Sequence, residues 1–237
     1  MSDAYYLHLT DRLREQLKDP DAFEDRRLPS ERVLAERFDT TRVTLRQALG
    51  QLEGEGRIHR SNRRGWFVSP PRLDYDPTRD SGFNDYVTAQ GRRPRTEVLL
   101  TDVQAYPPAA QALGLAAQTP LYHIRRRRFV DERAVLSESM CVVPERAPGL
   151  LEEGQFGVSL WAELRGRYGL TLAHRELRFY SESLGEQAAR ELGVAMGSSG
   201  LTVRRATFDE QHRPIGYDEE RWLHNALCIT VTLKNKP

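Results

Sequence analysis

The stretch LPSERVLAERFDTTRVTLRQALGQLEGEGRIHRSNRRGWFV, residues 28–68, has the pattern of two short helices followed by a basic hairpin. Ser30 can cap the first helix, and Thr41 can cap the second after a break at residues 39–40, because a hydroxyl can accept a hydrogen bond from a free backbone N–H. Apolar residues recur at helical spacing in both segments: Val33, Leu34, Ala35 and Phe38 in the first, and Val43, Leu45, Ala48, Leu49 and Leu52 in the second. Such a helix pair can place its second helix in the major groove of DNA.

The hairpin that follows is strongly basic. Residues 58–60 and 66–68 predict two short strands around a tip at residues 61–65. Residues 57–72 include five arginines and no acidic residue. Phosphate binding by such a run releases counterions, and arginine can make paired hydrogen bonds to guanine. An ordinary helix pair with a solvated basic loop is the alternative; it explains any single arginine, but it explains the ordered set poorly.

Residues 5–70 resemble the winged helix-turn-helix head of GntR-family bacterial transcription regulators. The resemblance rests on the motifs LPSER, LAERF, TRVTLRQAL, EGEGRI and GWFV. It implies that both helices contact DNA and that the wing tip reaches the minor groove, with these contact residues: Arg32, Thr41, Arg42, Thr44, Arg46, Arg64 and Gly65. The family wing commonly carries Gly-x-Gly, whereas this chain has Arg-Arg-Gly at residues 63–65, which adds charge to the tip.

Composition limits the other functions that are open to the chain. Its 237 residues suffice for two domains, and a net charge of only +1 means that DNA affinity has to come from local clustering of charge. No apolar run is long enough to span a membrane, and the N-terminus lacks a signal-peptide core, so we expect a cytoplasmic protein with no membrane partner. Cys141 and Cys228 lie outside any metal-binding spacing, so we expect no metal site and no cofactor.

Three regions are expected along the chain. Residues 1–70 form the DNA-binding head, in which an amphipathic helix at residues 5–17 packs under the helix pair. Residues 71–79 form an extended linker, because the run SPPRLDYDP is rich in proline and has no periodicity. Residues 80–237 form the second domain.

The second domain contains two copies of a helix–hairpin unit, at residues 113–138 and 192–219. Both copies begin with Leu-Gly, continue into an arginine-bearing strand and turn at Asp-Glu. Two such hairpins can join one antiparallel sheet, covered by helices at residues 107–113, 157–167 and 185–192. The predicted fold class is therefore α+β.

Alternation along the expected strands places Arg126, Arg128 and Glu138 on one face, among apolar neighbours. Charges in such surroundings need partners. One arrangement is an internal ion pair between the arginines and the glutamate. The other is a bound anion clamped by both arginines, with Glu138 receiving an amine or a hydroxyl. The sequence allows both.

Residues 80–230 resemble the effector-binding UTRA domain of the HutC subfamily, through IRRRRFVDERAVLSE, GVSLWAELRGRYGL, EQAARELGV and RRATFDEQHRPIGYDEE. The resemblance implies a chorismate lyase-like fold and a pocket lined by Ser81, Phe83, Arg126, Arg128, Glu138, Ser159, Trp161 and Glu219. Gly82-Phe83 stands where the family has Ser-Phe, and residues 221–226 depart from the family pattern Tyr-Arg-Gly-Asp-Arg-Tyr. Effector chemistry should therefore differ from that of the sugar-phosphate members. The run GWFVSPPRLDYDP is similar to regulators found with phosphonate-utilisation genes.

Both resemblances together imply a transcriptional repressor that binds a double-stranded operator as a homodimer. A small anionic metabolite (a phosphonate, a sugar phosphate or a carboxylate) would release it. One rival is an enzyme of chorismate lyase-like fold, although the sequence shows no Ser/His/Asp set, metal cluster or phosphate loop. Another is a constitutive DNA-binding protein whose second domain only dimerises.

Overall fold

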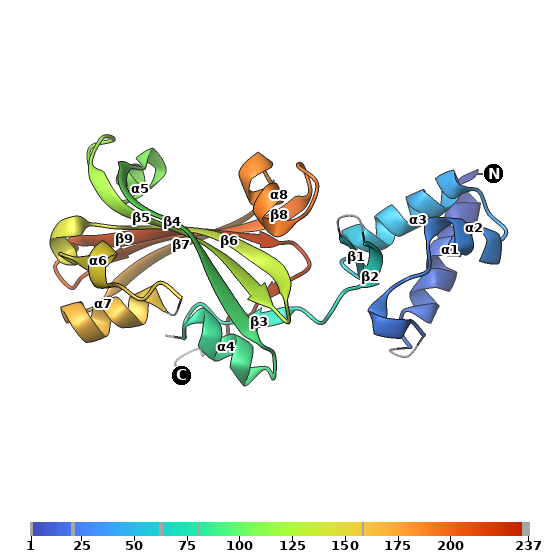
Figure 1. Cartoon of the computed structure of the whole chain (residues 1–237), viewed down its shortest axis with the longest axis horizontal. Helices are drawn as coiled ribbons and strands as arrows, with labels where there is room; N and C mark the ends of the chain where they lie inside the picture. Colours follow the sequence, from blue (N-terminus) through green and yellow to red (C-terminus); the bar gives the residue numbers. More distant parts are fainter. Residues whose placement is uncertain (1, 20–21, 62–63, 80, 158, 234–237) are drawn as a thin grey trace. The chain divides into compact units, whose positions relative to one another are not determined.

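The computed structural model describes residues 2–19, 22–61, 64–79, 81–157 and 159–233 (Figure 1). The chain forms two compact units, Met1–Arg72 and Leu73–Pro237.

The first unit is a three-helix head with a two-stranded wing. Its elements are α1 (Ser2–Gln16), the short 3-10 helix η1 (Glu24–Arg26), α2 (Glu31–Arg37), α3 (Arg42–Gly54), β1 (Ile58–Ser61) and β2 (Gly65–Val68). The Ser30 hydroxyl accepts a hydrogen bond from the backbone N–H of Val33, and the Thr41 hydroxyl accepts one from that of Thr44, so both predicted helix caps are confirmed. The antiparallel wing is confirmed as well.

The core of the head is apolar and gathers side chains from all three helices and the wing. Its members include the fully buried Leu13, Leu34, Leu45, Leu49, Leu52 and Ile58, together with the aromatic Phe23, Phe38 and Trp66. Two residues of the predicted stripes were placed wrongly, because Val33 is 39% and Val43 is 69% exposed. Val43 precedes the buried Leu45 by two positions, and at 3.6 residues per turn this places it on the opposite side of α3.

The second unit is built around one sheet. Its strands are β3 (Leu73–Tyr75), β4 (Pro94–Ala105), β5 (Pro120–Val130), β6 (Arg133–Val142), β7 (His174–Ser183), β8 (Ser199–Phe208), β9 (Pro214–Leu223) and β10 (Leu227–Ile229). Its helices are α4 (Phe83–Ala89), α5 (Pro107–Ala112), η2 (Pro144–Arg146), α6 (Leu150–Glu153), α7 (Leu160–Tyr168) and α8 (Glu186–Leu192).

Six strands form an antiparallel sheet in the order β4-β5-β6-β9-β8-β7. The two predicted hairpins are β5-β6 and β8-β9, and they meet where β6 pairs with β9. The helices α5 and α8 lie on one face of the sheet, and α4, α6 and α7 lie on the other (Figure 1). We call these the α5/α8 face and the α4/α7 face. The α+β prediction is confirmed.

The expected linker at residues 71–79 is partly a strand of the second unit. Residues 73–75 form β3, which pairs in parallel with β10 through partners such as Leu73 and Leu227. Leu73 and Tyr75 point into the core and are buried, which explains why this Pro-flanked segment is ordered despite its polar composition.

Candidate DNA-binding face and effector site

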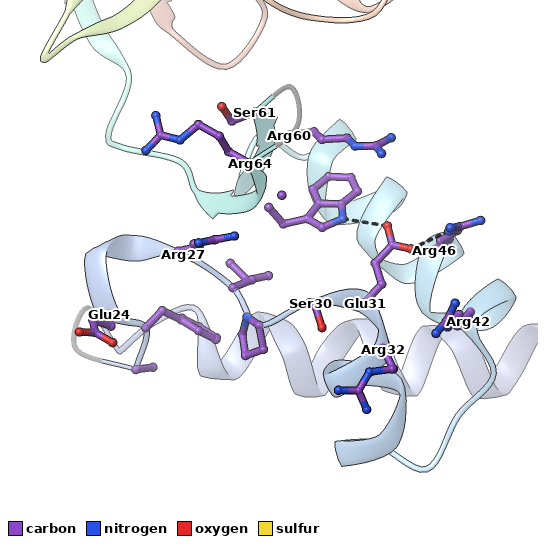
Figure 2. Close-up of a pocket in the computed structure, with 16 residues that line it drawn as sticks. Glu24, Arg27, Ser30, Glu31, Arg32, Arg42, Arg46, Arg60, Ser61 and Arg64 are labelled. Atoms are coloured by element: carbon purple, nitrogen blue, oxygen red, sulfur yellow. Dashed lines mark hydrogen bonds and ion pairs between the residues drawn. The ribbon is translucent and has the colours of Figure 1, made fainter.

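A basic hollow of about 840 Å³ lies between α2, α3 and the wing (Figure 2). Of its lining residues, six are arginines and two are glutamates: Arg27, Arg32, Arg42, Arg46, Arg60 and Arg64, with Glu24 and Glu31. Six positive charges against two negative ones leave an excess of four. The head therefore has the concentrated positive charge that the net charge of the whole chain does not show. We call this surface the basic face.

The first turns of α3 supply the central part of the basic face. Arg42 and Arg46 are exposed and lie one turn apart on α3. Thr41 caps the helix, and its hydroxyl also lies 3.0 Å from the hydroxyl of Thr44. This end of the second helix is the part that meets base edges in helix-turn-helix docking.

The remaining predicted contacts flank α3. Arg32 is exposed and pairs with Glu36, with Nη1 2.8 Å from Oε1. The Arg64 guanidinium lies over the ring of Phe67, 5.3 Å from its centroid. Gly65 has φ +100°, a conformation that favours glycine, so the wing turn itself requires this residue. Residues 62–63 of the predicted tip lie outside the described residues. Five of the seven predicted DNA contacts, Arg32, Arg42, Arg46, Arg64 and Gly65, line the hollow. Thr41 and Thr44 lie at the start of α3. Contact of these residues with DNA stays a prediction.

Sequence reasoning missed two residues of this surface and one exposed residue beside it. Arg27 and Arg60 also line the basic hollow, and Arg27 reaches it because residues 27–28 pair with β2. The exposed Val43 lies between Arg42 and Thr44 at the start of α3, where an apolar side chain can contact a thymine methyl group. Its helical position, away from the buried stripe, was the available signal.

The second candidate site is a buried cluster on the α4/α7 face. Arg126 and Arg128 of β5 both donate to Glu138 of β6, with Nε–Oε2 distances of 2.8 and 2.9 Å. Arg126 also donates to the backbone oxygen of Phe156, and Arg128 donates to the hydroxyl of Thr96. The two arginines and the glutamate are only 1%, 4% and 5% exposed. The predicted shared face is confirmed, and its three charged residues form an internal ion cluster.

Burial and ion pairing shift the pKa values of these three residues in opposite directions. Burial raises the pKa of Glu138, but the two arginines outweigh it and lower that pKa to about 2. Burial and the neighbouring charge of Arg128 lower the pKa of Arg126 to about 10. The pKa of Arg128 is raised, because its attraction to Glu138 exceeds the effect of burial. The cluster is therefore charged at neutral pH, with two cations and one anion.

Phe83 and Ser159 lie at the edge of the same cluster. The Arg128 guanidinium lies over the Phe83 ring, 4.8 Å from its centroid. The neighbouring Gly82 approaches Ser159 so closely that a Cβ at Gly82 would lie 2.9 Å from the Cβ and 3.1 Å from the hydroxyl oxygen of Ser159. A serine at position 82 would bring its Cβ too close to the Cβ of Ser159, so glycine fits here. The half-buried Ser81 directly precedes this contact.

Trp161 packs into the apolar cluster beside the arginines, whereas Glu219 lies elsewhere. The Trp161 cluster includes Met140, whose sulfur lies 2.7 Å from Nη2 of Arg126. Glu219 is on the α5/α8 face, because it pairs in register with Ser139, the residue after Glu138. There it accepts hydrogen bonds from Tyr106, Tyr217 and Arg204. The structure thus separates Glu219 from the other predicted effector residues.

Three further charged residues on the α4/α7 face were not predicted. Glu220 lies directly opposite Glu138 in the β6-β9 pairing. Arg205 contacts both Asp218 and Glu220, at 3.3 and 3.6 Å. Asp218 is fully buried, and burial together with Glu220 raises its pKa well above the ordinary value of 3.8. The alternation along GYDEE, which puts Asp218 and Glu220 on one face and Glu219 on the other, was the available signal.

Comparison with known proteins agrees with this arrangement. The model of the bacterial regulatory proteins of the gntR family matches residues 5–68, and the UTRA domain model matches residues 89–227. The chain belongs to the GntR family of regulators that carry a UTRA domain. It is accordingly a transcriptional regulator rather than an enzyme. The combination of the two matches fits the HutC-like subfamily of the GntR family.

Individual relatives cover nearly all of the chain. The HTH-type transcriptional regulator YihL of Escherichia coli K12 is 29% identical over 227 residues, covering 94% of this chain and 95% of YihL. The transcriptional repressor NagR of Bacillus subtilis is 26% identical over 204 residues, covering 86% and 84%. The crystal structure of PhnF from Mycobacterium smegmatis shares the fold, with a TM-score of 0.67, 24% identity and coverage of 96% and 99%.

Two kinds of feature are absent from the described part of the chain. No helix in it combines the length and the apolar character that crossing a membrane requires. Within the same residues, no three or more His, Cys, Asp or Glu side chains gather in a way that could hold a metal ion.

Proposed function

We propose that this regulator is a repressor that binds a pseudo-palindromic operator as a homodimer. The observation that carries the proposal is the basic face, where the exposed start of α3 and the wing present an excess of four positive charges. The start of α3 would read base edges, and the wing would lie along the neighbouring minor groove. Two relatives, NagR and the probable fructoselysine utilization operon repressor of E. coli, are named as repressors.

The effector would be a small anionic metabolite bound at Arg126 and Arg128. These arginines outnumber the single glutamate between them, so an added carboxylate, phosphonate or phosphate would bring the positive and negative charges closer to balance. Phe83 and Ser159 lie at the edge of the cluster and would close over the ligand. The internal ion cluster would then be the ligand-free state of the same site.

The strand β3 would carry the effector signal toward the head. It directly follows Arg72, the last residue of the first unit. Its Tyr75 contacts Tyr86 of α4, and Tyr86 contacts Phe83, with ring centroids 5.4 and 5.7 Å apart. A ligand that moves Phe83 would thereby bias β3, provided that it binds the operator-competent and incompetent states with different affinities.

Two measurements on the full chain test this proposal. Selection from a randomised DNA duplex pool should give a palindromic consensus bound by two copies of the chain. A thermal-shift screen of phosphonates, sugar phosphates and carboxylates should then find a compound that raises the melting temperature and weakens binding to that consensus. Failure to select any sequence would contradict operator binding. A tight ligand without effect on DNA affinity would contradict the regulatory role.

A further inference from the structure

Glu31 connects the wing to α3. This first residue of α2 accepts a hydrogen bond from Arg46 of α3 through Oε2, at 2.7 Å, and one from the indole N–H of Trp66 in β2 through Oε1, at 3.2 Å (Figure 2). Partial burial tends to raise the pKa of Glu31, but these hydrogen bonds outweigh it and the pKa is lowered. Glu31 is thus a carboxylate at neutral pH, and both of its oxygens are engaged.

The two side chains that donate to Glu31 differ in their conformational freedom. Trp66 is 8% exposed and packs in the core of the head, so its indole is held by its neighbours. The side chain of Arg46 is 66% exposed and extends over the basic face. The tightly packed Trp66 holds the Glu31 carboxylate in place through its hydrogen bond. The carboxylate in turn restrains the Arg46 side chain, which would otherwise sample many rotamers.

The hydrogen bond holds Arg46 by Nε, the nitrogen nearest its stem. The terminal nitrogens Nη1 and Nη2 lie beyond this anchor. An arginine that donates from both terminal nitrogens can address O6 and N7 of one guanine, and this is a contact that discriminates between bases. The Nε anchor fixes the plane of the guanidinium before DNA arrives, so less conformational freedom is lost on binding.

We propose that Glu31 and Trp66 are specificity-determining positioning residues, which orient Arg46 to read a guanine in the major groove through its terminal nitrogens. The inference rests on the proposed operator binding by α3 and adds the residues that set its base preference. The opposite arrangement is that Glu31 only sequesters Arg46 and competes with DNA. A carboxylate on the basic face would then weaken all DNA binding equally.

A measurement of base preference distinguishes a Glu31 that orients Arg46 from a Glu31 that only sequesters it. The duplex selected by the wild-type chain is prepared with each guanine replaced in turn by adenine, keeping the pairing intact. Affinities for these duplexes and for a random duplex are measured with the wild type, Glu31→Gln, Trp66→Phe and the double variant. Glu31→Gln removes the charge but keeps an acceptor oxygen, and Trp66→Phe keeps the apolar ring but removes the N–H. Thermal melting confirms that each variant is folded.

At one guanine position per half-site, Glu31→Gln should reduce the guanine-to-adenine affinity ratio by about 5-fold or more, with affinity for the random duplex equal or slightly higher. Trp66→Phe should reduce the same ratio by a smaller factor. The double variant should be no worse than Glu31→Gln, because Trp66 acts through Glu31. Unchanged ratios at every guanine, or an equal gain of affinity for all duplexes, would overturn the inference. A wild-type chain that selects no sequence would overturn the proposed function itself.

Discussion

Arg205 donates a hydrogen bond from Nη2 to the phenol oxygen of Tyr75, at 2.6 Å. The bond joins β8 of the sheet to β3, the first strand after the head. Arg205 also faces Asp218 and Glu220, and these acids raise its pKa despite its burial. Burial raises the pKa of Tyr75 to about 12, so its phenol stays neutral. The Arg205 guanidinium thus connects β3 with two acids of β9 that lie on the same face of the sheet as the candidate effector site.

Tyr75→Phe should weaken the coupling between effector and operator. It removes the acceptor for Arg205 but keeps the ring contact with Tyr86. A hydrogen bond to a charged group contributes about 1.5–3 kcal/mol, which is comparable to a typical coupling free energy. We expect effector binding to persist while the effector-induced change in operator affinity falls several-fold. Tyr180→Phe on the edge strand β7 is the control, and an equal change in both variants would argue against a role for β3.

Glu138→Gln should destabilise the chain by about 3–5 kcal/mol, because it leaves two buried arginines with a neutral partner. The free energy of unfolding in urea measures this. Glu97→Gln is a matched control, since Glu97 pairs with Arg127 but is 40% exposed, and it should cost about 1 kcal/mol or less. Similar losses in the two variants would show that the buried cluster contributes little.

Arg126→Ala should abolish the effector response while operator binding remains. The change removes one of the two cations proposed to hold the anion and leaves Arg128 paired with Glu138. Calorimetric titration with the effector, followed by an operator gel shift, measures both properties. Arg127→Ala serves as the control, because Arg127 lies on the other face of β5. If Arg126→Ala responds normally, the ion cluster is only structural.

Asp218→Asn should stabilise the chain increasingly as pH rises above about 4. The folded-state pKa of Asp218 lies well above 3.8, so between 3.8 and that folded-state pKa the folded chain binds more protons than the unfolded chain. Wild-type stability then falls with rising pH, and the asparagine variant lacks this fall. Urea unfolding at several pH values measures the difference.

Asp209→Asn should change the pH dependence of stability in the direction opposite to Asp218→Asn. Burial raises the pKa of Asp209, but hydrogen bonds from Arg213 and Arg146 outweigh it and lower that pKa. The carboxylate therefore contributes stability above the ordinary value of 3.8, and this contribution is lost as pH falls through the folded-state pKa. The variant should be less stable than the wild type at neutral pH and approach it in acid. Identical pH profiles for both variants would contradict these assignments.

Local patterns in the sequence predicted much of the fold. The caps Ser30 and Thr41 were readable because each hydroxyl bonds to a backbone N–H three residues away. The shared face of Arg126, Arg128 and Glu138 followed from the alternation of side chains along a strand. These features depend only on neighbours in the chain or in one hairpin.

Contacts between distant segments could not be read in this way. The bond from Trp66 to Glu31 spans 35 residues, and the bond from Arg205 to Tyr75 spans 130. Nothing in the sequence around Trp66 or Arg205 indicates which distant residue accepts its hydrogen bond. Whether β3 is a strand or a linker is decided by its pairing with β10, which joins nearly opposite ends of the second unit. The face of Glu219 was within reach, because it follows from the register of β9 against β6.

The most direct test of the account is the affinity of Arg46→Ala for the duplex selected by the wild-type chain, measured at fixed salt. Losing a bidentate guanine contact costs about 1–3 kcal/mol, so we expect at least a 5-fold loss of affinity in each half-site and a relaxed preference at one guanine. Arg190→Ala on α8, an exposed arginine of the second unit, should bind like the wild type. Wild-type affinity and base preference in Arg46→Ala would contradict the claim that α3 reads the operator.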